Sequence, residues 1–241
     1  MAAKGGTLKE LLRNRKSGGL LIPLWNEYLL SDEFNGSERR IDVFHPSEIS
    51  YENFCPRAWC LRQLYPEDYK REFTAQQQLT FEIGKALHSM AEKHWSKMGI
   101  LYGVYMCVHC EALHYGFRPT ECRECGLKGF RYQEIACPDE DLLIAGHKDA
   151  EVMLGMQKFL VEFKTANEYN YGKVRSAQTP IEAHRRQSLI YFHCSEKNRQ
   201  RRIEQMQAIG TPDALKAIET ERLPYSGLLI MYLNKNSSLV S

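Results

Sequence analysis

The sequence lacks any long apolar run. No stretch approaches the roughly 18 apolar residues that a membrane-spanning helix needs, and the opening residues contain no apolar core of a signal peptide. A large charge of one sign is also missing, because the formal net charge is only +2. Total charge therefore gives no argument for a nucleic-acid partner, and any basic surface must be local. These absences predict a soluble cytoplasmic protein.

Internal repeats and low-complexity tracts are also missing, while core-forming residues are plentiful. Hydrophobic residues make up 43% and charged residues 26% of the 241 residues. This composition predicts one sizeable domain, alone or with a small accessory module. The densest basic stretch lies late in the chain and is typical of a solvated helix face; it comprises Arg185, Arg186, Lys197, Arg199, Arg201 and Arg202.

Helical patterns alternate with strand-like segments. Thr7 and Glu10 form a possible capping box for a helix over 7–16, within an N-terminal arm of unknown role over 1–45. Further helices are predicted over 47–64, with Pro56 beginning a second helix, over 75–98 and over 181–201. The helix over 75–98 repeats apolar residues at helical spacing, which predicts a buried stripe; the stripe comprises Leu79, Ile83, Leu87, Met90, Ala91 and Trp95.

Strand-like segments occupy 130–135, 142–146, 150–154, 158–163 and 227–233. Segment 101–130 differs, with four cysteines, several glycines and few aliphatic residues. The order of elements predicts an α/β fold with a small insertion over 105–128.

The segment 146–165 holds the most specific chemistry. Side chains alternate along a strand, so Glu162 and Lys164 project from the same face. Gly155 suits the first position of a two-residue II′ turn. With that turn Leu154 pairs with Gln157, and counting outward places Asp149 opposite Glu162. Directly opposed side chains have Cβ atoms about 5 Å apart, so two carboxylates and an ammonium converge; a different turn would shift this register.

Two carboxylates and a lysine are the groups that metal-dependent phosphodiester hydrolysis needs. Carboxylate oxygens hold Mg²⁺ or Mn²⁺ together with waters and a phosphate oxygen. The lysine can orient the attacking water or stabilise developing negative charge. The structural alternative for Asp149, Glu162 and Lys164 is a cross-strand salt bridge on a solvated hairpin.

Two helical patterns flank this hairpin. Gly84, His88 and Glu92 recur every four residues and share one helix face, as do Gln187 and Tyr191 after the hairpin, with His184 on the same side. Each pattern alone is ordinary, because a lone histidine is commonly a core residue.

Four elements follow one another along the chain: a helix with His88, a strand with Asp149, a strand with Glu162-x-Lys164 and a helix with Gln187-x-x-x-Tyr191. This joint order resembles the RecB-like branch of the PD-(D/E)XK nuclease superfamily. The resemblance covers about 46–233, and Ser47 with Cys55-Pro56-Arg57 also resembles the first helices of that family. It implies a restriction-endonuclease-like core over 46–241, with a central mixed sheet flanked by helices.

The resemblance also implies roles for individual residues. His88, Asp149, Glu162 and the main-chain carbonyl of Phe163 would bind the divalent metal, and Lys164 would be the catalytic lysine. Gln187 and Tyr191 would line the DNA-facing side, and Glu134 would assist.

Cys107-x-x-Cys110 and Cys122-x-x-Cys125 form two knuckles eleven residues apart. Paired knuckles deliver four thiolates to tetrahedral zinc, and Gly126 suits the turn after the second. We expect a structural Zn²⁺ without a catalytic role, with His109 and His114 as substitutes should one thiolate not bind.

The remaining cysteines raise an iron–sulfur alternative, because some RecB-like nucleases hold a cluster with one early and three late cysteines. Here Cys55, Cys60 and Cys137 come early and only Cys194 follows Tyr191. Inert thiols are the favoured interpretation.

Together these patterns predict a Mg²⁺- or Mn²⁺-dependent deoxyribonuclease. The resemblance to compact phage and bacterial members of the RecB-like branch implies an exonuclease that acts on DNA ends in recombination, repair or replication. The expected setting is a bacterial or phage-infected cell, and the expected partner is a recombination or replication protein. A structure-specific endonuclease is the alternative within enzymes. The alternative outside enzymes is a non-catalytic nucleic-acid-binding or assembly protein that uses the zinc ribbon.

Overall fold

A mixed six-stranded sheet forms the centre of the computed structural model, which describes residues 21–31, 40–66 and 73–235. The strand order is β2-β1-β6-β7-β8, and β3 pairs with β1. All pairings are antiparallel except that of β7 with β8. The strands are β1 (Leu101–Cys107), β2 (Leu113–Phe117), β3 (Phe130–Gln133), β6 (Ala150–Leu154), β7 (Gln157–Ala166) and β8 (Tyr225–Asn234); β4 (Ile135–Ala136) and β5 (His147–Lys148) form a separate pair.

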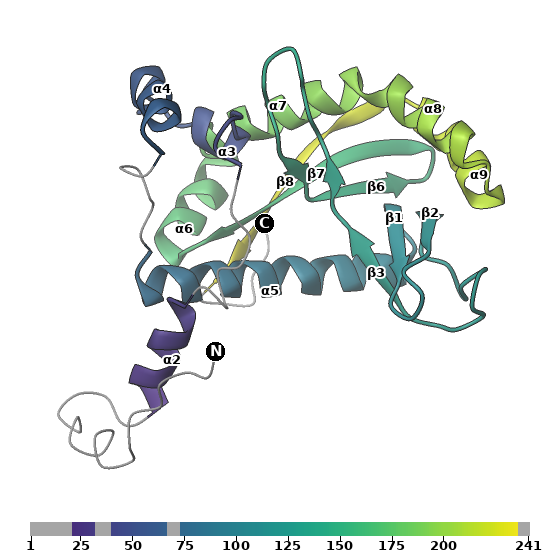
Figure 1. Ribbon diagram of the computed structural model, residues 1–241, viewed down its shortest axis with the longest axis horizontal. Coiled ribbons are helices and arrows are strands. Elements are labelled where there is room, and N and C mark those ends of the chain that lie inside the picture. The colour runs from purple at the N-terminus through teal and green to yellow at the C-terminus, as the bar shows by residue number, and fades with distance from the viewer. Residues whose placement is uncertain (1–20, 32–39, 67–72, 236–241) are drawn as a thin grey trace.

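Helices cover both faces of this sheet. Helix α5 crosses one face, while α7 and α8 cross the other (Figure 1). The helices are α2 (Leu21–Leu29), α3 (Pro46–Ile49), α4 (Pro56–Leu64), α5 (Ala75–Met98), α6 (Glu168–Ala177), α7 (Glu182–Lys197), α8 (Arg199–Ile209) and α9 (Pro212–Arg222). The predicted α/β class with a central mixed sheet flanked by helices is therefore confirmed, whereas the helix predicted over 7–16 lies outside the described residues.

Helix α5 has the bounds that the sequence predicts. Thr74 and Gln77 form a capping box at its start, and Gly99 ends it with a φ of 72°. The predicted buried stripe is partly wrong, because Ile83 is 42% and Met90 45% exposed. Instead Ala91 is buried in the core under the sheet, with the partly buried residues Leu87 and Trp95 beside it. On a helical wheel Ile83 and Met90 lie roughly 100° away from this contact line.

Two other predicted elements differ from the structure. The strand predicted over 142–146 is wrong: the chain turns there, and only Ile144 forms isolated bridges, with Phe44 and Asp139. The Asp139 carboxylate accepts hydrogen bonds from the amides of Asp141 and Leu142, which stabilises the turn. The helix predicted over 181–201 is two helices that meet at Asn198.

The cysteine-rich segment contributes to the central sheet. Strand β1 is buried or half-buried along its whole length and pairs with β2, β3 and β6. The sequence does not predict β1 or β2, because cysteines and glycines interrupt the alternation of apolar and polar residues within 101–130. Cys107 ends β1, so the four-cysteine segment extends directly from the sheet.

Candidate metal and catalytic site

The β6–β7 hairpin has the register that the turn chemistry predicts. Gly155 has a φ of 62° and Met156 does not have a positive φ, as a II′ turn requires. Leu154 pairs with Gln157, and the ladder continues to Ala150 opposite Val161. The ladder ends there, and one residue further in the same register Asp149 would lie opposite Glu162.

A hydrogen bond fixes Asp149 against the neighbouring strand. The Phe163 amide donates to Oδ2 of Asp149 at 2.7 Å. The other oxygen, Oδ1, lies 4.0 Å from Nδ1 of His88 on helix α5. The His88 ring also packs against Phe163, with the ring centroids 5.3 Å apart. One carboxylate is thus held between β7 and α5, with its second oxygen facing the histidine.

Glu162 is almost fully buried, with 1% of its side chain exposed. Its Oε2 accepts a hydrogen bond from Nζ of Lys164 at 3.2 Å. Its Oε1 is buried and has no hydrogen-bond partner among the described residues. A buried carboxylate oxygen without a donor is costly, so this position suits either a proton or a cation.

Burial and mutual repulsion dominate the electrostatics of the pair. Burial and the nearby Asp149 charge raise the pKa of Glu162 to about 8, against the opposing effect of Lys164. Burial also raises the pKa of Asp149, although His88 and Lys164 oppose the rise. Burial lowers the pKa of His88. Near neutral pH the site therefore has a neutral imidazole at His88 and a Glu162 carboxyl group that holds its proton unless a cation replaces it.

Two further acidic residues surround Asp149. Burial and the charges of Glu134 and Asp149 raise the pKa of Glu92 to about 7. Loss of hydration and the Asp149 charge also raise the pKa of Glu134. The resemblance implies an assisting role for Glu134 and none for Glu92. Its position four residues after His88 was the signal that could have placed it here.

Helix α7 closes the other side of the site. Tyr191 is buried, and its ring packs so closely on Gly146 that a Cβ there would lie 2.8 Å from the ring. Burial and the Glu162 charge raise the pKa of Tyr191, and a hydrogen bond with Gln187 opposes this rise. Nδ1 of His184 forms a hydrogen bond with the Tyr232 hydroxyl at 2.9 Å. Burial, and to a smaller extent the Lys164 charge, lowers the pKa of His184 to about 4.

The carboxylates and His88 approach one another without forming a tight ligand shell. Among the described residues, only the four cysteines of the two knuckles have ligand atoms that all lie within 4.8 Å of one another. Asp149 therefore lies near His88 and Glu162 without a ligand shell, whereas the cysteines already have metal-site spacing.

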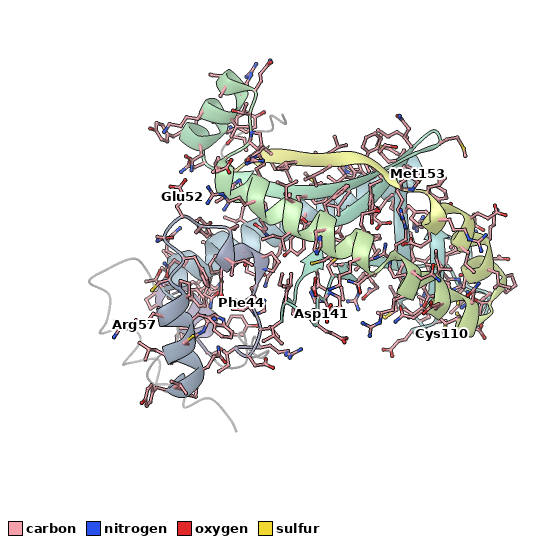
Figure 2. All side chains as sticks on the ribbon, turned by 90° about the horizontal axis from the view of Figure 1, so that it is seen from above. Phe44, Glu52, Arg57, Cys110, Asp141 and Met153 are labelled. Carbon is pink, nitrogen blue, oxygen red and sulfur yellow. The ribbon has the colours of Figure 1, made fainter. Side chains whose placement is uncertain are left out.

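The four sulfur atoms pair closely across the two knuckles. Cys107 Sγ lies 3.7 Å from Cys125 Sγ, and Cys110 Sγ lies 3.5 Å from Cys122 Sγ. A tetrahedral Zn²⁺ with bonds of about 2.3 Å places its sulfurs about 3.8 Å apart. The cluster thus matches a structural zinc site. In Figure 2 Cys110 lies at the opposite end of the molecule from Arg57.

The two histidines near the cysteines make other contacts. His114 is buried, and its Nε2 lies 3.4 Å from Cys122 Sγ while its Nδ1 lies 3.9 Å from Oδ2 of Asp213. His114 therefore supports a thiolate and links the cluster to α9, as outer ligand partners do. His109 hydrogen-bonds the Lys128 carbonyl at 3.1 Å.

The other four cysteines lie apart from the knuckles. Cys55 and Cys60 are exposed, at the start of α4 and within it. Cys137 and Cys194 are buried, and both pack in the core beside Tyr191.

The basic stretch late in the chain is largely neutralised by acidic partners. Arg185 and Arg186 pair with Glu182, and Arg202 pairs with the buried Glu221. The other members pair likewise, Lys197 with Asp139 and Asp141, Arg199 with Glu196, and Arg201 with Glu140. The sequence pattern is typical of a solvated helix face, and in the structure this stretch is an ion-paired helix surface.

No helix in the described part of the chain combines the length and apolar character needed to cross a membrane.

Comparison with protein-family models, with curated proteins and with solved structures gives no match to this chain.

Proposed function

We propose that this protein is a metal-dependent deoxyribonuclease with its catalytic centre at Asp149, Glu162 and Lys164. The observation that supports this most is the convergence of the three side chains on one patch of sheet. Asp149 is held by the Phe163 amide and Lys164 by Glu162. A solvated salt bridge would leave both carboxylates hydrated, whereas Glu162 is 1% exposed.

The residues present fit a hard divalent cation. The unpartnered Oε1 of Glu162 and the free oxygen of Asp149 are oxygen donors of the type that Mg²⁺ and Mn²⁺ prefer. His88 and the main-chain carbonyl of Phe163 would complete the ligand set. When bound there, the metal would supply a Lewis acid for the phosphodiester and activate water near neutral pH.

The protein's own groups have distinct tasks in this proposal. Glu162 binds the cation once its proton leaves. Lys164, which is 14% exposed, orients the attacking water and stabilises negative charge as it develops on the phosphate. The Phe163 amide keeps the Asp149 carboxylate in a single orientation. Gln187 and Tyr191 bound the site on the side where DNA would lie.

The resemblance to RecB-like nucleases favours an exonuclease acting on DNA ends in recombination, repair or replication. A restriction-endonuclease-like core would then contain the site, and the zinc cluster would stabilise the strand ends of β1 and β2 at a distance from it. A purely nucleic-acid-binding protein has weaker support, because it gives no role to the combination of Asp149, Glu162 and Lys164.

The substrate class can be tested with end-labelled linear duplex, single-stranded and closed circular DNA, each with Mg²⁺ or Mn²⁺. We expect degradation of linear DNA, sparing of circles, and loss of activity in Asp149→Ala. Cleavage of circles would replace the exonuclease with an endonuclease. If Asp149→Ala keeps full activity, the proposed catalytic centre is wrong.

A further inference from the structure

Strand β8 forms one edge of the central sheet. It pairs with β7 from Tyr225 to Asn234, with one irregularity at Ser226, and within the described ranges no strand pairs with its other edge. In Figure 2 the yellow strand runs along the border of the molecule. Its outer amide and carbonyl groups are therefore available to a further extended chain.

The composition of β8 makes this edge unusual. Its ten residues, Tyr-Ser-Gly-Leu-Leu-Ile-Met-Tyr-Leu-Asn, contain no charged residue and no proline. Leu229 is 42% exposed, and the neighbouring Leu228 and Ile230 are half-buried. Edge strands of soluble proteins commonly carry lysine, proline or a bulge, which prevents pairing with other chains. The one irregularity of β8 is at Ser226, and the stretch from Gly227 to Asn234 is regular. An apolar edge of this length favours a strand that covers it.

A groove runs beside the edge and can receive side chains. It has a volume of about 510 Å³. Its floor includes Leu228, Ile230 and Tyr232 of β8, and its wall includes Val174 of α6 and Pro180 of the α6–α7 link. Since side chains alternate along a strand, a chain added to β8 would direct every second side chain into this apolar space.

The rim of the groove is positively charged. Arg175 and Arg185 line it, and Arg185 shares Glu182 with Arg186. Arg175 is exposed and forms no hydrogen bond or ion pair with any described residue. Residues 168–186 contain four cations, Lys173, Arg175, Arg185 and Arg186, and two carboxylates, Glu168 and Glu182. Glu52 adds a third carboxylate, 3.9 Å from Arg186, so one cation remains in excess. This excess favours an acidic occupant.

We propose that β8 and the α6–α7 groove form a docking site for an extended segment of a partner protein, with apolar side chains on one face and flanking carboxylates. Main-chain hydrogen bonds to β8 would supply affinity, and the groove and Arg175 would supply specificity. A second copy of this chain fits less well, because the β8 of that copy offers no carboxylate to Arg175.

The docking site can be tested with a fluorescein-labelled peptide, Gly-Glu-Ile-Thr-Val-Thr-Ile-Glu-Gly, by fluorescence anisotropy at low salt without added metal. We expect saturable binding to the full chain. Arg175→Glu should weaken it about tenfold or more, because a charge-assisted pair is lost. The matched control Lys216→Glu, an exposed site on α9, should leave it unchanged. Methylation of alternate peptide amides should abolish binding, because it removes the donors to β8.

Three results would overturn the proposal. The first is absence of saturable binding, or equal binding of the methylated peptide. The second is a dimer in sedimentation velocity that Leu229→Lys dissociates, which would assign the edge to a second copy. The third is displacement of the peptide by a short oligothymidylate in a manner that depends on Arg175, which would assign the groove to nucleic acid. None of these measurements requires nuclease activity.

Discussion

Replacing the buried Glu162 with glutamine should stabilise the protein at alkaline pH. The pKa of Glu162 is raised from an ordinary 4.5 to about 8 by burial and by Asp149. Between these two values the folded protein holds a proton that the unfolded chain releases, so stability falls as pH rises from about 4.5 to about 8. Glutamine mimics the protonated carboxyl and does not titrate.

The expected size follows from this interval. At about 1.4 kcal/mol per pH unit it corresponds to at most about 5 kcal/mol. Asp149 and Lys164 titrate together with Glu162, so part of the effect passes to them. We therefore expect Glu162→Gln to exceed the wild type by roughly 2–4 kcal/mol at pH 8.5 and to match it near pH 5. For a chain of this size the Tm should rise by about 5–15 °C at the higher pH.

Differential scanning calorimetry at the two pH values measures this difference. The buffer should lack added Mg²⁺ and chelator, so that the cysteine site keeps its metal. Glu219→Gln, at an exposed position on α9, is the matched control and should show no pH-dependent difference. A Glu162→Gln variant that is less stable than the wild type at pH 8.5, or a difference independent of pH, would refute the reasoning.

Four other changes test the site and its supports. Asp149→Asn should keep the acceptor for the Phe163 amide and the fold, yet reduce DNA cleavage about 100-fold or more; near-normal rates would contradict a ligand role. Lys164→Ala should lower kcat by about 10²–10³ while the Mg²⁺ affinity stays within a few-fold, as separate titrations of rate and metal can show. Cys122→Ser should lower both zinc content and Tm, and a purified wild type with iron or without zinc in elemental analysis would contradict the zinc assignment. Gly146→Ala should cost about 1–3 kcal/mol in urea unfolding, because the added methyl would lie 2.8 Å from the Tyr191 ring; unchanged stability would contradict that packing.

Local signals predicted the hairpin and the long helix correctly. Gly155 favours a II′ turn, and that turn determines every pair back to Ala150 opposite Val161. The capping residue Thr74 and the left-handed Gly99 similarly determine both ends of α5. These predictions depend on the local backbone preferences of particular residue types, which can be inferred from a few neighbouring residues in the sequence.

Features that depend on tertiary packing could not be predicted from the sequence. The burial of α5 follows the line where it meets the sheet, so Ile83 and Met90 remain exposed although they are apolar. The turn after Asp139 depends on two amides held by one carboxylate. The approach of Glu92 to Asp149 depends on how α5 lies across the sheet, and periodicity does not contain that information.

The central claim is most directly tested by cleavage of linear DNA with and without added Mg²⁺ or Mn²⁺, comparing the wild type with Glu162→Gln. Calorimetry shows beforehand that the variant is folded, and Glu219→Gln again serves as the control. We predict metal-dependent cleavage by the wild type and the control, and none by Glu162→Gln. Equal cleavage by Glu162→Gln and wild type, or no cleavage by folded wild type with either metal, would contradict the nuclease centre.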